Sequence, residues 1–129
     1  MQIVNNLSMV SVLVSDMKKA KEFYAEKLGL EVATDYRQND NNWWVTLTFP
    51  GGGTSVTLAR SSTTHNEPPK PGTISFYFST SDITAAHRAL NEKGVETDEI
   101  MDDLYGPGSG VKFFQLKDPD GNQVTFAQA

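Results

Sequence analysis

The chain has 129 residues, which is the length of a single domain, and we expect one domain that spans 1–129. Hydrophobic residues make up 38% of it, and its formal net charge at pH 7 is -5. The acidic balance disfavours nucleic acid as a partner, because phosphate backbones are bound by clustered lysine and arginine. There is no cysteine, which excludes thiolate ligands, cysteine nucleophiles and disulfides. The lack of a leader or a long apolar run predicts a cytoplasmic protein with no membrane partner.

The first half of the chain, about 6–60, reads as a strand, a helix and three further strands. Alternating valines over 9–14 predict the first strand. Asp16 is placed to cap a helix that begins at Met17, and Gly29 is placed to end it. The three further strands are predicted at 30–36, 43–49 and 55–59.

The second half, about 73–129, repeats this order. Asp82 is placed to cap a second helix, which Gly94 ends, at nearly the same spacing as in the first half. Strands are predicted at 73–78, 95–100 and 111–116, with a last strand at the end of the chain. Residues 60–72 have no periodicity and the composition of a linker.

A tight turn at 118–122, with the sequence Asp-Pro-Asp-Gly-Asn, leads into this last strand. The strand sequence Val124–Ala127 matches Val56–Ala59 at an offset of 68 residues, which is 124 minus 56. The sequence therefore predicts one module written twice.

These motifs resemble the vicinal oxygen chelate superfamily, which includes glyoxalase I, bleomycin resistance proteins and extradiol dioxygenases. The resemblance covers nearly the whole chain and rests on Val12–Asp16, Phe23–Tyr24, Leu28–Leu30 and Asp118–Asn122. It implies an α+β fold of two tandem βαβββ modules, whose curved mixed sheets surround a cavity. It also implies a homodimer, with or without exchange of modules between the two copies.

Metal-dependent members of this superfamily take four ligands from the first and last strands of the two modules. In this chain the corresponding positions are Met9, Thr57, Ser75 and Thr125. A divalent metal prefers imidazole or carboxylate donors, and none of these four residues supplies one. We therefore expect no metal and no other cofactor.

Strand alternation places one set of side chains on the sheet faces opposite the helices, where the superfamily keeps its cavity. Trp43 and Trp44 must face opposite ways, and we assign Trp44 to the cavity because Trp43 shares a face with the apolar Val45 and Leu47. The predicted ligand-binding residues are Met9, Ser11, Trp44, Thr57, Ser75, Tyr77, Tyr105, Phe113, Gln115 and Thr125. The loop 102–110 around Tyr105 is interpreted as a lid or as an ordinary acidic loop.

The leading hypothesis is a metal-independent protein that binds an organic small molecule, as the bleomycin resistance proteins do by sequestration. The alternative is a lyase or isomerase like glyoxalase I, or another enzyme of this superfamily. A metal-free enzyme that uses Tyr77 or a loop carboxylate as general acid or base is a third interpretation. His65 and His87 are interpreted as surface or boundary residues. Phe23, Leu28 and Phe126 are expected in the core.

Overall fold

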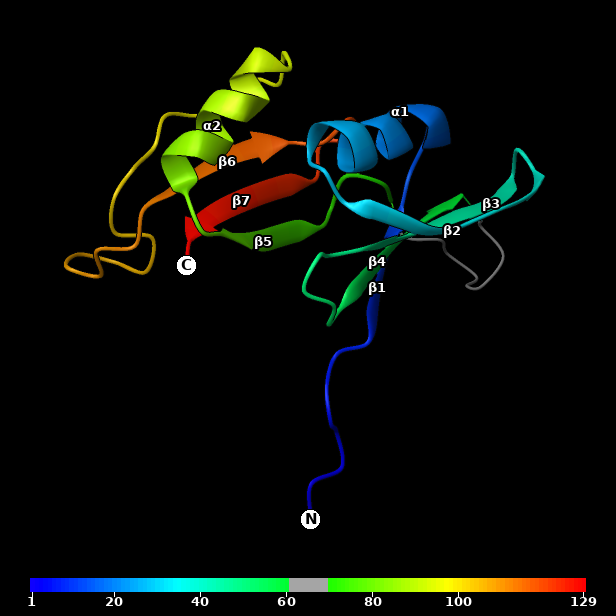
Figure 1. Cartoon of the computed structure of the whole chain (residues 1–129). Coiled ribbons are helices and arrows are strands. Elements are labelled where there is room, and N and C mark those ends of the chain that lie inside the picture. Colours follow the sequence, from blue (N-terminus) through cyan, green and yellow to red (C-terminus); the bar gives the residue numbers. More distant parts are fainter. Residues whose placement is uncertain (61–69) are drawn as a thin grey trace. The chain divides into compact units, whose positions relative to one another are not determined.

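The structure, a computed structural model, describes residues 1–60 and 70–129 and divides into two compact units, Met1–Pro71 and Gly72–Ala129. Each unit is a sheet with a helix on one face (Figure 1). Most of the predicted linker at 60–72, including His65, lies outside the described residues. Within the described ranges, no helix has the length and apolar character needed to cross a membrane.

Unit 1 contains a four-stranded sheet in the order β1-β4-β3-β2. Its elements are β1 (Met9–Leu13), α1 (Met17–Lys21), η1 (Glu22–Lys27), β2 (Glu31–Asn39), β3 (Asn42–Thr48) and β4 (Ser55–Arg60). Strands β1 and β4 are parallel, and the other pairs are antiparallel. All three strands predicted after the helix are therefore present.

The helix of unit 1 changes its winding partway along. Asp16 caps α1 as predicted, since its carboxylate accepts the backbone N–H of Lys19 at 3.1 Å. After Lys21 the chain continues as a π-helix, in which the N–H of Leu28 bonds to the carbonyl of Phe23, five residues earlier, at 2.9 Å. The predicted helix is therefore present, and its second half is wound as a π-helix. The wider turn reduces the angle between successive side chains, so the neighbours Phe23 and Tyr24 are both buried.

One face of the unit 1 sheet packs against α1 and forms the core of this unit. Alternate residues of the strands are buried there, among them Val12, Val45, Leu47, Val56 and Leu58. Met17 and Ala20 of α1 are buried as well. Because strand residues alternate between faces, this core fixes which side chains lie on the opposite face.

Unit 2 contains a three-stranded sheet in the order β5-β7-β6, with its helix on one face. Its elements are β5 (Ser75–Thr80), α2 (Ile83–Glu92), β6 (Phe113–Lys117) and β7 (Gln123–Gln128). Strand β7 is parallel to β5 and antiparallel to β6. Asp82 caps α2 by accepting the N–H of Ala85 at 3.0 Å, as predicted.

The strand predicted at 95–100 does not form a regular pair. Asp98 donates its N–H to the carbonyl of Gln115, and Met101 exchanges two hydrogen bonds with Phe113. In a regular antiparallel pair with Met101 opposite Phe113, Asp98 would lie opposite residue 116. It bonds to Gln115 instead, so the register slips by one residue between the two contacts. The acidic side chains at 96, 98 and 99 also have low strand propensity. This segment is instead held against α2, where His87 bonds to the carbonyl of Asp98 and to the hydroxyl of Thr97.

The turn at 118–122 joins β6 to β7 and fastens both to the start of β5. The carboxylate of Asp118 accepts the side-chain amide of Asn122 at 2.7 Å and the backbone N–H of Asn122 at 2.8 Å. The other end of the Asn122 amide accepts the N–H of Ile74 at 2.8 Å. Both side chains are buried and hydrogen-bonded, so the polar residues Asp118 and Asn122 of this turn have a structural role.

Aromatic rings fill the space between the unit 2 sheet and α2. Phe114 is fully buried and stacks on Phe126 with ring centroids 5.1 Å apart. His87 of α2 packs edge-on against Phe114, which makes it the boundary residue that the sequence predicted. Leu28 and Phe126, which were also expected in the core, are half-buried. Phe23 is buried in unit 1 as expected.

Candidate functional site

We call the sheet face that lies opposite α1 the open face of unit 1. The predicted residues Met9, Ser11, Trp44 and Thr57 all lie on it, because they alternate with the buried core positions. Met9 is 51% exposed and Trp44 is 40% exposed. Trp43 lies on the helix side and is half-buried, where its indole N–H donates to Asp35 at 2.7 Å.

Two further residues belong to this face and were not predicted from the sequence. Tyr36 is paired with Trp44 across β2 and β3, and their rings meet edge-to-face with centroids 5.2 Å apart. Thr46 is paired with Thr57, and their hydroxyls are 3.2 Å apart. The signal that could have found them is the register of the hairpin formed by β2 and β3. Two shifts interrupt that register, so the residues that lie opposite one another cannot be found by counting outward from the turn.

The corresponding open face of unit 2 is the one opposite α2. The predicted residues on it are Ser75, Tyr77, Phe113, Gln115 and Thr125. Tyr77 is 61% exposed, whereas Thr125 has no exposed surface. The side-chain amide of Gln115 donates to the hydroxyl of Thr125 at 3.2 Å. In each unit, therefore, a threonine of the last strand, Thr57 or Thr125, is buried on the open face among more exposed side chains of the adjacent strands.

Tyr105 lies outside both sheets, in the loop 102–110, and its side chain is 73% exposed. The loop is held by its own hydrogen bonds: Asp103 accepts the N–H of Gly110 at 2.8 Å, and Leu104 donates to the carbonyl of Val111 at 3.1 Å. Asp103 has a φ of 64°, a conformation that costs energy for a residue with a side chain. The role of this loop as a lid stays a prediction.

The four positions that the superfamily uses for metal ligands do not suit a metal here. The hydroxyl of Thr57 donates to the sulfur of Met9 at 2.7 Å, and the hydroxyl of Thr125 accepts from Gln115. A thioether and neutral hydroxyls that are already hydrogen-bonded lack the charge and basicity that divalent ions require. Among the described residues, no three His, Cys, Asp or Glu side chains form a group that could hold a metal.

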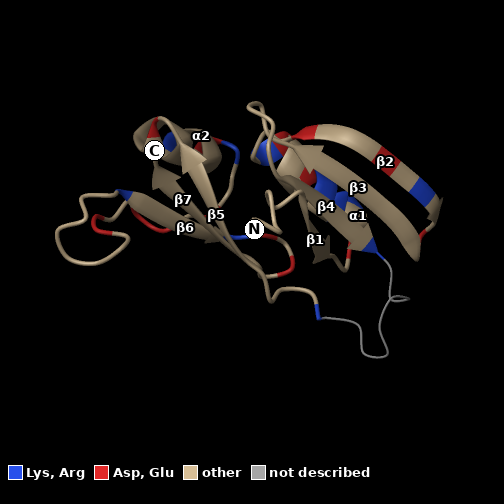
Figure 2. Ribbon diagram, turned by 90° about the horizontal axis from the view of Figure 1, so that it is seen from below, with Lys and Arg blue, Asp and Glu red and all other residues tan. Residues whose placement is uncertain are grey.

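Charged residues on the strands that form the open faces are concentrated on β2, with Lys117 at the end of β6. In Figure 2, bands of both signs run along β2, whereas β5 and β7 carry no charged residue. Strands β1 and β3 are also uncharged, and β4 has only Arg60 at its end. The open faces can therefore offer aromatic, thioether, hydroxyl and amide groups to a ligand, but few counter-ions.

Known proteins resemble the chain over almost its full length. Protein YwkD of Bacillus subtilis (strain 168) is 26% identical over 121 residues, which is 92% of each chain. The structure of TnmS3, an antibiotic binding protein from Streptomyces sp. CB03234, superposes with a TM-score of 0.79 at 29% identity, covering 99% of this chain and 98% of TnmS3.

A member of the glyoxalase superfamily from Sphaerobacter thermophilus DSM 20745 superposes with a TM-score of 0.78 at 30% identity, covering 98% of each chain. The likeness confirms the predicted fold class, two curved mixed sheets with few helices. Residues 6–126 match the model of the same family. The chain therefore belongs to the Glyoxalase/Bleomycin resistance protein/Dioxygenase superfamily.

Proposed function

We propose that this protein binds and sequesters an uncharged, flat organic molecule without the help of a metal. The observation that carries the proposal is the open face of unit 1, where Met9, Tyr36 and Trp44 are exposed. The charged neighbours of Tyr36 on β2, Asp35 and Arg37, contact Trp43 on the helix side instead. An exposed cluster of this kind is the usual mark of a binding surface. The antibiotic-binding relative TnmS3 supports a role in binding an antibiotic or another xenobiotic.

Each aromatic residue contributes contact area with few torsions to immobilise. Tyr36 supports Trp44 edge-on, so the indole is held ready for a ligand ring. In unit 2 we assign the same task to Tyr77 and Phe113, which lie on an open face of similar chemistry. The donor set at Met9 and Thr57 does not support the metal-dependent lyase or isomerase chemistry of the alternative.

The test uses the neutral fluorescent amine 1-aminoanthracene as a probe. Trp44→Ala should weaken its binding about tenfold, equivalent to about 1.4 kcal/mol, because one stacked ring is lost. Ile3→Ala is the control, since Ile3 is an exposed apolar residue that lies outside both sheets and outside the pocket residues. Equal affinities for the parent, Trp44→Ala and Tyr77→Ala would show that the open faces do not bind the probe.

We also propose that the protein is a homodimer in the cytoplasm. Sheet edges are unpaired at β1 and β2 in unit 1, and every residue of the nine-residue strand β2 is exposed. An uncovered edge of that length is commonly paired or covered. Light scattering should give about twice the chain mass of 14.2 kDa. A mass near that of one chain over a wide concentration range would contradict this prediction.

A further inference from the structure

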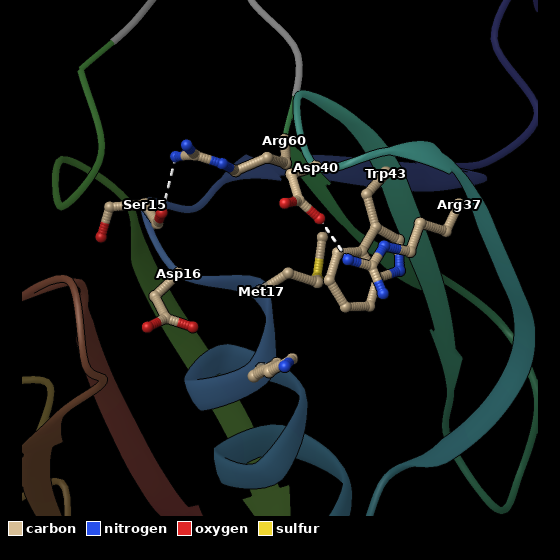
Figure 3. A pocket seen from close by; sticks show the side chains of 8 residues that line it. Ser15, Asp16, Met17, Arg37, Asp40, Trp43 and Arg60 are labelled. Atoms are coloured by element: carbon tan, nitrogen blue, oxygen red, sulfur yellow. Dashed lines mark hydrogen bonds and ion pairs between the residues drawn. The ribbon is translucent and has the colours of Figure 1, made fainter.

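A pocket of about 200 Å³ lies on the helix side of unit 1, on the opposite side of β3 from Trp44 (Figure 3). The residues that matter for its chemistry are Met17, Lys18, Arg37, Asp40, Trp43 and Arg60. They come from the start of α1, from the hairpin of β2 and β3, and from the end of β4. None of them belongs to the open face described above.

The floor of this pocket is apolar and rigid. Met17 is 3% exposed, and Figure 3 shows its sulfur directed toward the Trp43 ring. The indole N–H of Trp43 is anchored on Asp35 at 2.7 Å, while the Arg37 guanidinium lies 4.4 Å from the ring centroid. A ring fixed in this way can receive a second flat group without loss of its own freedom.

The rim of the pocket has more cations than anions that could neutralise them. Asp40 pairs with Arg37, which holds the pKa of Asp40 below its ordinary value. Asp16 also lines the pocket and keeps its negative charge while it caps α1, so three cations, Lys18, Arg37 and Arg60, face two carboxylates. Within the part of the chain that the structure describes, neither Lys18 nor Arg60 has an ion-pair partner.

Arg60 is held in place at the rim. Its Nη1 donates to the backbone carbonyl of Ser15 at 2.6 Å, and its charge is one of those that lower the pKa of Asp40. Among the described residues, no carboxylate lies within ion-pair distance of Arg60. In Figure 3 the side chain of Arg60 runs from beside Asp40 toward Ser15, whereas Asp40 points toward Arg37. A carboxylate of a ligand would match Arg60 and Lys18, because a guanidinium held by a neutral carbonyl still attracts an anion.

We propose that this pocket binds a small aromatic carboxylate, with the ring against Met17 and Trp43 and the carboxylate between Lys18 and Arg60. The volume suits a single ring with one acidic group. Asp40 opposes the binding by its own negative charge. The site is independent of the neutral-ligand function proposed for the open faces, since its ligand and its face of the sheet are both different.

The test is an NMR titration of the full chain with benzoate at constant ionic strength, into the tens of millimolar range expected for so small a ligand. Two indole N–H signals report on the two sites, and Trp44→Phe identifies them. The Trp43 signal should shift and the Trp44 signal should not. Benzamide, which has the same ring without the charge, should bind at least fivefold more weakly.

Lys18→Gln and Arg60→Gln should each weaken benzoate binding at least threefold, and Asp40→Asn should strengthen it. Arg88→Gln, which removes an exposed cation on α2, is the matched control and should have no effect. Lys18→Gln keeps the test valid if loss of the bond from Arg60 to Ser15 disturbs the fold. Absence of a Trp43 shift, a shift of Trp44 instead, or equal affinities in Lys18→Gln and Arg88→Gln would each overturn the proposal.

Discussion

Replacing Asn122 with alanine removes the side-chain amide that joins the turn at 118–122 to β5. This amide has no exposed surface and bonds at both ends, to the N–H of Ile74 at 2.8 Å and to the carboxylate of Asp118 at 2.7 Å. An ordinary hydrogen bond contributes about 0.5–1.5 kcal/mol and one to a carboxylate about 1.5–3 kcal/mol. We therefore expect Asn122→Ala to lower the free energy of unfolding by about 2–4 kcal/mol.

The assay is guanidinium unfolding followed by far-UV circular dichroism, which reports on both units. Tryptophan fluorescence reports on unit 1 alone, because Trp43 and Trp44 both lie there, and coincident transitions would justify a two-state analysis. Asn41→Ala is the matched control, since Asn41 is exposed in the turn between β2 and β3 and should change stability by no more than about 0.5 kcal/mol. If both alanine variants unfolded at the same denaturant concentration as the parent, the structural role assigned to Asn122 would be wrong.

Two further predictions concern stability. A Cβ on Gly72 would lie 2.3 Å from the carbonyl oxygen of Asp120 at a φ of 88°, so Gly72→Ala should cost at least about 2 kcal/mol. Gly51→Ala, which meets no atom within 4 Å, should be nearly neutral, and equal unfolding midpoints would contradict the assignment. The pKa of Asp35 lies below its ordinary value of 3.8, chiefly because Lys21 donates a hydrogen bond to it. The stabilisation by the ionised Asp35 is present above pH 3.8 and is lost as the pH falls further. Asp35→Asn should therefore reduce the free energy of unfolding at pH 7 and make that free energy depend less on pH in the acid range. An unchanged acid range would contradict the role assigned to Asp35.

Features set by neighbours in sequence were predicted correctly. Asp16 and Asp82 cap their helices because an aspartate side chain reaches the N–H three residues later. Gly29 and Gly94 end them with φ values of 85° and 81°, which favour glycine. The alternation of valines on β1 also predicted the buried face, because a two-residue period needs no knowledge of the partner strand.

Features that depend on distant partners were missed. The π-helix satisfies the packing of Phe23 and Tyr24 on the sheet, and helical spacing alone gives no sign of it. The segment 95–100 looks extended in sequence, yet its pairing depends on the register that Gln115 and Phe113 can offer. Tertiary contacts override local propensity in both places.

The candidate sites divide in the same way. The face of Trp44 followed from alternation, whereas its partner Tyr36 required the cross-strand register. The pocket at Trp43 gave no sequence signal, because Lys18, Arg37 and Arg60 come from three separate segments. Such charged residues look like ordinary solvated surface until the fold brings them together.

The threonines of the two open faces support the proposal that the ligand is uncharged. Thr57 and Thr125 stand at equivalent positions in the last strand of each unit, and both are buried. Their hydroxyls are already paired within their own sheets, with Thr46 and Gln115 respectively, so covering them with an apolar ring leaves no polar group unsatisfied. A charged ligand on the same face would lose its hydration and find few counter-charges in return, Lys117 of β6 being one. Of two ligands with the same shape, the uncharged one is therefore expected to bind more tightly.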